Sequence, residues 1–116
     1  MHELPIVKQI LEAVLAHAEE NHAARVCKVV LDIGGMHDLV PEWVEKFFNF
    51  ASRGTIAEHA RLVINQTPII CRCNACGCNF VFRLHTEQHP LCPDCNAESF
   101  SLIAGKELLL REIEVC

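Results

Sequence analysis

Two pairs of cysteines constrain the fold of this chain more than any other feature of its sequence. Each pair has two residues between its cysteines, and fifteen residues separate the pairs, which gives the spacing C-x2-C-x15-C-x2-C. A two-residue gap lets both sulfurs converge on one metal ion while the intervening N–H groups point at sulfur. This spacing is typical of zinc ribbons with four thiolate ligands. The four cysteines are Cys73, Cys76, Cys92 and Cys95.

The residues around the two pairs fit the same interpretation. Gly77 and Asn96 each follow the second cysteine of a pair, where the turn needs a positive φ that glycine and asparagine tolerate best. Between the pairs, Phe80, Val81 and Phe82 are expected to form a strand that covers the site. The segment therefore predicts a ribbon folded around one zinc ion.

The predicted zinc is structural, because four thiolates complete a tetrahedral shell and leave no open position for a substrate. It would supply most of the folding energy of a segment too small for a core of its own. Two disulfides are disfavoured in a chain without a signal peptide. A rubredoxin-like iron centre remains an alternative, because it uses similar cysteine pairs and would make the protein red and redox-active. An enzyme with a C-x-x-C redox site would need free, reactive thiols, whereas four zinc-bound thiolates are occupied.

Four further cysteines lie outside this pattern: Cys27, Cys71, Cys78 and Cys116. We expect Cys27 to be a small buried apolar residue. Cys71 and Cys78 could act as additional ligands for a soft metal, although the four predicted ligands already complete a zinc shell.

Hydrophobic periodicity predicts two helices and several strands around the cysteine segment. The helices are expected at residues 5–21 and 41–52, the strands at 26–33, 61–70, 99–103 and 108–115, and the cysteine segment at 71–96. Pro68 should end its strand or place it at a sheet edge. The buried stripe of the second helix is expected to contain Val44, Phe47, Phe48 and Ala51, joined by Trp43 and Phe50.

These elements predict an α+β fold, with two helices on a roughly three-stranded mixed sheet and an inserted zinc-ribbon-like domain. The parts of the chain before and after the cysteine segment can pack together as one layer pair. The predicted domains are residues 1–67 plus 103–116, and residues 68–102.

Composition narrows the range of functions. The formal net charge is −5 and the basic residues are scattered, which disfavours nucleic acid as a partner. No apolar run approaches the roughly 20 residues that a membrane span requires. The N-terminus lacks the pattern of a signal peptide, so we expect a cytoplasmic protein without a membrane role. A Ser/His/Asp set, a phosphate-binding loop and a carboxylate pair in a cleft are also not evident, so we do not expect an enzyme.

The N-terminal residues Met1, His2 and Glu3 offer a second metal site. The Met1 amine, the His2 amide and the His2 imidazole can close two adjacent chelate rings on one ion. Glu3 can add a fourth donor through its amide nitrogen or its carboxylate. Four in-plane nitrogen or oxygen donors suit Ni(II) or Cu(II). Taken alone this signal is weak, because a histidine at position 2 is usually an exposed side chain without a metal.

Other histidines are weaker candidates for the same role. His37 follows a glycine pair and could be a ligand or only a polar loop residue. His85 and His89 flank the zinc ribbon, where they could assist a transferred metal. His17, His22 and His59 are expected to be solvated surface residues.

Together these features resemble the HypA/HybF family of nickel-insertion accessory proteins. The resemblance covers essentially the whole chain and rests on the Met1–Glu3 start, the following helix, the strand ending at Ile33-Gly34, the aromatic second helix, residues 53–58 and the two cysteine pairs. The cysteine pairs alone occur in many zinc ribbons, whereas their combination with an N-terminal Met-His-Glu is far more specific. Cys71 and Cys78 are extra to the family's metal pattern.

The resemblance implies a nickel metallochaperone with a structural zinc domain. It implies that His2 is the main Ni(II) ligand and that nickel is delivered to the large subunit of nickel–iron hydrogenase, with a HypB-type GTPase as partner. The oligomeric state stays open, and a homodimer is compatible with the sequence. The alternative function is a zinc-ribbon adaptor that binds proteins and has no nickel role.

Overall fold

The computed structural model describes residues 3–85 and 91–116, and the chain divides into two compact units. One unit, which we call the helical unit, comprises the chain up to Asp32 together with Leu39–Asn65 and Leu109–Cys116. The other, the ribbon unit, comprises Ile33–Asp38 and Gln66–Leu108. The ribbon unit therefore contains the predicted insert of residues 68–102 and extends beyond it at both ends.

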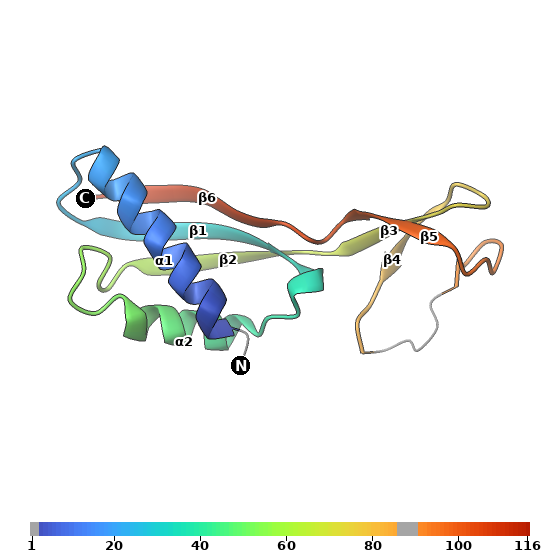
Figure 1. Cartoon of the computed structure of the whole chain (residues 1–116), viewed down its shortest axis with the longest axis horizontal. Coiled ribbons are helices and arrows are strands. Elements are labelled where there is room, and N and C mark those ends of the chain that lie inside the picture. The colour runs from blue at the N-terminus through green and yellow to red at the C-terminus, as the bar shows by residue number, and fades with distance from the viewer. Residues whose placement is uncertain (1–2, 86–90) are drawn as a thin grey trace. The chain divides into compact units, whose positions relative to one another are not determined.

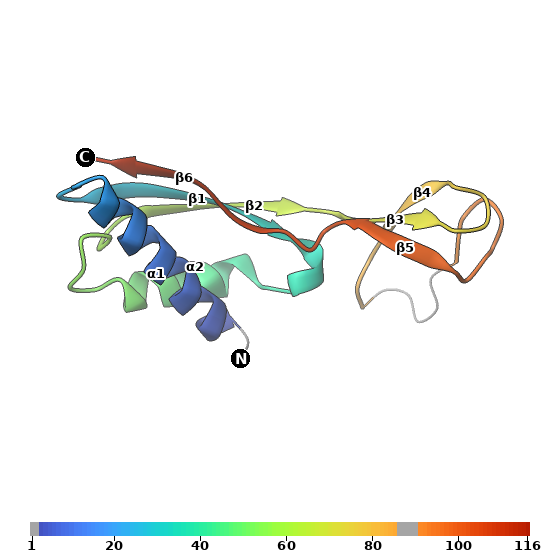
Figure 2. The same ribbon diagram turned by 45° about the horizontal axis from the view of Figure 1, so that its top comes forward.

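The helical unit contains both helices and most of one sheet. Its elements are α1 (Glu3–Glu20), α2 (Pro41–Ala51), β1 (Val26–Gly34), β2 (Arg61–Thr67) and β6 (Leu108–Val115). The strand order is β2-β1-β6. β1 and β2 run in the same direction and β6 runs against them, so the sheet is mixed, and both helices lie on one side of it (Figure 1 and Figure 2). The predicted α+β architecture is confirmed.

The core of this unit follows the periodicity of the sequence. Apolar positions three or four residues apart on a helix share one face, and α1 buries such a stripe against the sheet and α2. The fully or nearly buried side chains include Val7, Ile10, Val14 and Ala18 of α1, Val44 and Phe48 of α2, and Val26, Val29 and Leu31 of β1.

Two aromatic residues of α2 were predicted to be buried but are exposed. Trp43 is 43% exposed and Phe50 is 66% exposed. They are seven residues apart and so share a flank of the helix that lies away from the stripe of Val44 and Phe48. A cation lies over each exposed ring, Lys46 over Trp43 at 5.4 Å and Arg53 over Phe50 at 5.2 Å from the ring centroid.

The ribbon unit contains a second sheet, with strand order β4-β3-β5. Its strands are β3 (Ile69–Cys73), β4 (Asn79–Phe82) and β5 (Phe100–Ala104), and β3 pairs antiparallel with both neighbours. The predicted strand 61–70 is split, because Pro68 cannot donate to a strand ladder and separates β2 from β3. The short 3-10 helix Gly35–His37 also belongs to this unit.

Apolar side chains cover one face of the ribbon sheet. Cys71 pairs with Phe80 of β4 and with Leu102 of β5. The ring of Phe100 lies 5.7 Å from the ring of Phe80 and 6.1 Å from that of Phe82, centroid to centroid. Cys71 is only 2% exposed, and burial raises the pKa of its thiol. Cys71 is therefore part of the apolar packing.

Two chain segments of the ribbon unit approach closely at a pair of glycines. Gly34 donates its N–H to the Glu107 carbonyl at 2.7 Å, and Met36 donates to the Gly105 carbonyl at 2.8 Å. A Cβ on Gly34 would lie 2.1 Å from the Gly105 oxygen. Gly105 has a φ of +113°, and a Cβ there would lie 2.6 Å from the Ile69 Cα. Only glycine fits these two positions without moving backbone.

Gly105→Ala is therefore expected to destabilise the protein strongly. A left-handed backbone costs an alanine about 1–2 kcal/mol, and the backbone clash adds about 1–3 kcal/mol. Gly54→Ala is the matched control, because Gly54 also has a positive φ, +79°, but a Cβ there would meet nothing within 4 Å. The free energy of unfolding from urea titration should fall further in Gly105→Ala. Equal losses in the two variants would contradict the close approach.

Glu107 holds the same crossing together through both carboxylate oxygens. Oε2 accepts a hydrogen bond from the Thr67 hydroxyl at 2.6 Å, and Oε1 accepts one from the Gly105 N–H at 2.8 Å. The Thr67 hydroxyl first, and then the Gly105 N–H, hold the pKa of Glu107 below its ordinary value of 4.5.

A lowered pKa makes this contribution dependent on pH. The carboxylate stabilises the folded chain above the unfolded-state pKa, and the contribution is lost as pH falls through the lower folded-state pKa. In Glu107→Gln, the urea midpoint should therefore be reduced at neutral pH and approach that of the native chain in acid. Both proteins must be measured at both pH values. Zinc loss in acid affects the two proteins alike, so it cancels when their urea midpoints are compared at the same pH. An equal difference between the proteins at both pH values would refute this role.

Candidate metal centre

The structure brings Cys73, Cys76, Cys92 and Cys95 together in the ribbon unit. All four Sγ atoms lie within 4.8 Å of one another. The Sγ atoms of Cys73 and Cys95 are 3.5 Å apart, and those of Cys76 and Cys92 are also 3.5 Å apart. We call these four residues the four-cysteine cluster.

The two halves of the cluster have the same backbone hydrogen bonds. In the first, the Cys73 N–H donates to the Cys78 carbonyl at 2.8 Å and the Gly77 N–H donates back to the Cys73 carbonyl at 3.0 Å. In the second, Cys92 donates to Ala97 at 3.0 Å and Asn96 donates back to Cys92 at 2.8 Å. The tight turn puts Gly77 at a φ of 78° and Asn96 at 60°, as their places in the sequence predicted.

Backbone N–H groups point at the sulfur of Cys73. Cys76 donates to it at 3.4 Å and Ala75 at 3.3 Å. These N–H groups, that of Cys76 first, lower the pKa of Cys73 to about 6 against the opposing effect of burial. The turn therefore favours the thiolate, which is the form that binds metal.

The neighbouring thiols hold their protons more tightly. The Cys78 N–H lowers the pKa of Cys76. The hydrogen bond between the Cys76 and Cys92 thiols and the desolvation of Cys76 outweigh this effect and raise the pKa to about 12. The Ala97 N–H likewise lowers the pKa of Cys95. The hydrogen bond with the Cys73 thiol and the desolvation of Cys95 outweigh this effect, so the pKa of Cys95 is raised. Metal binding must therefore release protons from the cluster.

The geometry of the cluster fits a zinc ion. Zn–S bonds of about 2.3 Å in a tetrahedron place sulfurs about 3.8 Å apart, within the range seen among these four. Cys92 and Cys73 are buried, while Cys76 and Cys95 are exposed.

The two extra cysteines nearby do not belong to the cluster. Cys71 is buried in the sheet, and the Cys78 thiol contacts the Asn79 carbonyl at 3.4 Å. The Asp94 side chain raises the pKa of Cys78 to about 11.

The predicted N-terminal site is only partly covered by the structure. Met1 and His2 lie outside the described residues. Glu3 begins α1, two residues before the predicted start, and is 6% exposed. Its Oε2 accepts a hydrogen bond from the Val40 N–H, at the start of α2, at 3.3 Å.

The other histidine candidates make contacts within the ribbon unit. His37 Nε2 lies 3.0 Å from the Lys106 carbonyl oxygen. His85 Nε2 lies 2.8 Å from the Asp38 carboxylate, and both side chains are mostly exposed. His89 lies outside the described residues. Sequence reasoning did not find the contact between His85 and Asp38, because 47 residues separate the two.

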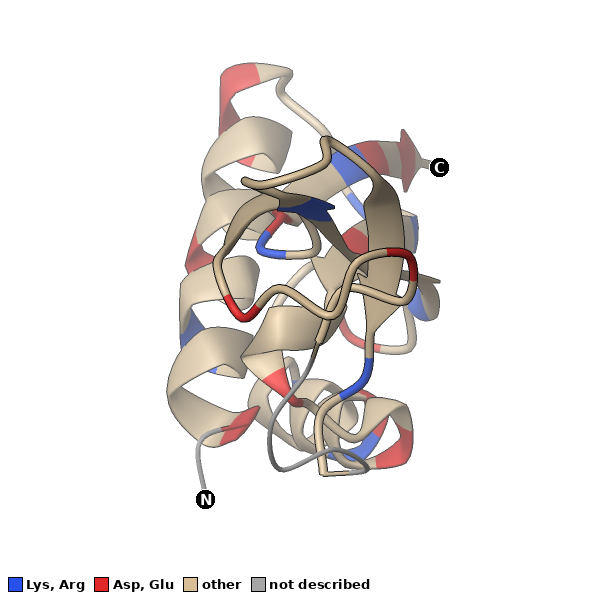
Figure 3. Ribbon diagram, turned by 90° about the vertical axis from the view of Figure 1, so that its right-hand side faces the viewer, with Lys and Arg blue, Asp and Glu red and all other residues tan. Residues whose placement is uncertain are grey.

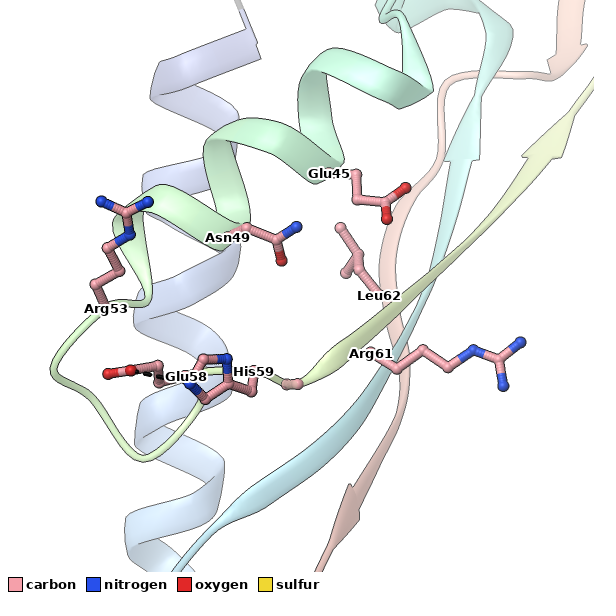
Figure 4. Close-up of a pocket in the computed structure, with 8 residues that line it drawn as sticks. Glu45, Asn49, Arg53, Glu58, His59, Arg61 and Leu62 are labelled. Atoms are coloured by element: carbon pink, nitrogen blue, oxygen red, sulfur yellow. Dashed lines mark ion pairs between the residues drawn. The ribbon is translucent and has the colours of Figure 1, made fainter.

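A groove of about 530 Å³ lies between α2 and the start of β2 in the helical unit (Figure 4). Its charged lining groups do not converge. Glu58 accepts a hydrogen bond from the Gly54 N–H at 2.6 Å and lies 3.1 Å from the His59 ring. Arg53 and Arg61 point away from each other in Figure 4.

Charged residues are spread over the structure. In Figure 3 the Lys and Arg positions lie on several elements, interspersed with Asp and Glu. Within residues 3–85 and 91–116, none of the helices combines the length and the hydropathy that a membrane span requires.

Comparison with known proteins gives a consistent family. A family model described as "Hydrogenase/urease nickel incorporation, metallochaperone, hypA" matches residues 1–115. Hydrogenase maturation factor HypA of Geobacter sulfurreducens is 37% identical over 115 residues, covering 99% of each chain. HypA of Aquifex aeolicus is 33% identical over 115 residues, covering 99% of this chain and 97% of its own.

The fold agrees with this family. The solution structure of the Ni metallochaperone HypA from Helicobacter pylori matches with a TM-score of 0.66 at 22% identity, covering 99% of this chain and 97% of that one. A second HypA solution structure matches with a TM-score of 0.68, also at 22% identity, covering 100% of this chain and 97% of its own. The chain therefore belongs to the HypA family of hydrogenase and urease nickel-incorporation metallochaperones.

Proposed function

We propose that this protein binds Ni(II) at its N-terminus and delivers it to the large subunit of nickel–iron hydrogenase during maturation. The family match over residues 1–115 carries this proposal, because it includes the Met-His-Glu start as well as the cysteine pairs. We further propose that delivery involves a HypB-type GTPase and takes place in the cytoplasm.

The proposed nickel ligands are the Met1 amine, the amide and imidazole of His2, and Glu3. The contacts of the Glu3 side chain support one of its two possible donor groups. Its carboxylate is buried and bonded to Val40, so ligation through that group would break a hydrogen bond. We therefore assign the fourth position to the Glu3 backbone amide, and give the carboxylate the role of holding the start of α1 against α2.

Such a site suits transfer rather than storage. Square-planar donors favour Ni(II) over zinc, and a site made from the first three residues can be approached by a partner's ligands. Amine, amide and imidazole must lose or lack protons to bind, so nickel affinity should fall as pH falls.

We propose that the four-cysteine cluster holds a structural zinc that maintains the ribbon unit. All four sulfurs are occupied when the metal is bound, which leaves the zinc no open position for catalysis.

Calorimetric titration of Ni(II) into the zinc-loaded full-length chain tests the proposal. One nickel site is expected in addition to the one zinc measured by elemental analysis. The alternative function, a zinc-ribbon adaptor without a nickel role, predicts zinc but no specific nickel site.

Transfer can be followed in the same preparation. Nickel-loaded chain mixed with apo hydrogenase large subunit should lose nickel to it faster than the ion exchanges with a small-molecule chelator of equal affinity. Equal rates would argue for simple release and against delivery.

A further inference from the structure

Two thiols outside the four-cysteine cluster lie close together in the helical unit. Cys27 is the second residue of β1, and Cys116 directly follows β6. The Cys116 N–H donates to the Arg25 carbonyl at 3.1 Å, and the Cys27 thiol donates to the Glu114 carbonyl at 3.2 Å. These contacts set residues 25–27 opposite residues 114–116.

The register puts both thiols on one face of the sheet. Arg25 lies opposite Cys116 and Cys27 lies opposite Glu114, so Cys27 and Cys116 are diagonal neighbours of an antiparallel pair. The neighbouring Cys116 thiol is the main cause that raises the pKa of Cys27 to about 11, and desolvation adds to it. Cys27 is half-buried and Cys116 is exposed, so the predicted burial of Cys27 is not observed.

We propose that Cys27 and Cys116 form a reversible disulfide when the chain meets a small-molecule disulfide such as glutathione disulfide. The modification would join β1 covalently to β6.

The exchange proceeds in two steps. The exposed Cys116 loses its proton to solvent, and its thiolate attacks one sulfur of glutathione disulfide and expels one glutathione thiolate. The Cys27 thiolate, after losing its proton, then attacks the Cys116 sulfur and expels the second. The two protein thiols are oxidised by two electrons, glutathione disulfide is reduced, and the two glutathione thiolates take up the two protons.

The other cysteines are less suited to this reaction. The four-cysteine cluster is occupied when zinc is bound, and Cys71 is buried in the ribbon sheet. Cys78 is half-buried and contacts the Asn79 carbonyl. Cys116 is exposed and has a second thiol beside it, which is the arrangement of a nucleophile with a resolving partner.

The geometry also indicates that the bond is easily reduced. Diagonal neighbours in antiparallel sheets are about 7–8 Å apart, slightly more than the roughly 6.8 Å that a relaxed disulfide spans between Cα atoms. Cys116 lies just beyond the last residue of β6 and can move by the difference. A bond formed under such tension exchanges readily, so it should open in excess reduced glutathione.

The test uses the zinc-loaded full-length chain incubated with glutathione disulfide. After free thiols are blocked, mass spectrometry should show a chain lighter by two hydrogen atoms, with one peptide containing Cys27 linked to one containing Cys116. Amide hydrogen exchange at the β1–β6 end should slow in this form. Reduced glutathione in excess should restore the original mass and exchange rate.

The variants distinguish the pair from general thiol oxidation. Cys27→Ser should stop at the first step and retain glutathione on Cys116, whereas Cys78→Ser should form the cross-link at the native rate. Separate glutathione adducts on both thiols of the native chain, without the linked peptide, would overturn the proposal. So would a loss of two hydrogen atoms in Cys27→Ser, because it would mean that Cys116 pairs with a different cysteine. Zinc content measured alongside verifies that the cluster stays intact.

Discussion

Cys76→Ser should lose its zinc and unfold the ribbon unit. A serine hydroxyl stays protonated near neutral pH and is a poor zinc ligand, and three thiolates cannot close the shell. Structural zinc contributes on the order of 10 kcal/mol to the folding of small metal-binding domains. That exceeds what the single apolar face of the ribbon sheet can replace, so the loss should be complete rather than partial.

Elemental analysis and hydrogen exchange together measure this effect. Zinc should fall from one per chain to none, and the amides of β3, β4 and β5 should lose protection. Cys78→Ser is the control, because Cys78 lies outside the four-cysteine cluster and a serine there can still donate to the Asn79 carbonyl. A Cys76→Ser chain that keeps both its zinc and its strand protection would show that the cluster is not the metal site.

His2→Ala is expected to abolish specific nickel binding. The substitution removes the imidazole and with it the larger of the two chelate rings. We expect the nickel Kd to rise at least about a hundredfold, which corresponds to about 2.7 kcal/mol. An N-terminal extension should have the same effect, because it converts the Met1 amine into an amide that does not bind at neutral pH.

Calorimetry on both altered chains tests the N-terminal site. His17→Ala is the matched control, because His17 is an exposed histidine in the last turn of α1, beside Glu20, and lies outside the proposed site. Its nickel affinity should equal that of the native chain. Stoichiometric binding that survives in the extended chain would place nickel elsewhere in the molecule.

Local patterns in the sequence predicted most of the fold. Gly77 and Asn96 were expected at positive φ because each ends a cysteine pair, and both have it. Pro68 was expected to end a strand, and β2 ends at the residue before it. In each case the determining interaction lies within a few residues, where spacing and side-chain type are sufficient.

The predictions that were wrong concern burial, which depends on residues far apart in the sequence. Periodicity assigned Trp43 and Phe50 to the buried side of α2, whereas the width of the buried face depends on what packs against the helix. Cys27 was expected in the core, and its partner Cys116 is 89 positions away. A local stretch of sequence cannot predict that the start of β1 lies beside the end of β6.

The candidate metal sites also have a part that the sequence predicts and a part that it does not. The four-cysteine cluster could be predicted because each pair is local and the two pairs share one chemistry. The hydrogen bond from the Val40 N–H to Glu3 could not, because it requires the start of α1 to meet the start of α2. Tertiary contacts of this kind change how a proposed ligand takes part without changing its identity.

The strand order β2-β1-β6 also affects how the chain folds during synthesis. The first two strands leave the ribosome early, but their third partner follows all of β3, β4 and β5. The nascent chain therefore exposes one edge of β1 until the intervening ribbon has emerged, and unpaired edges favour association with other chains. Early zinc capture would shorten the loop left to close and limit the time that this edge stays open.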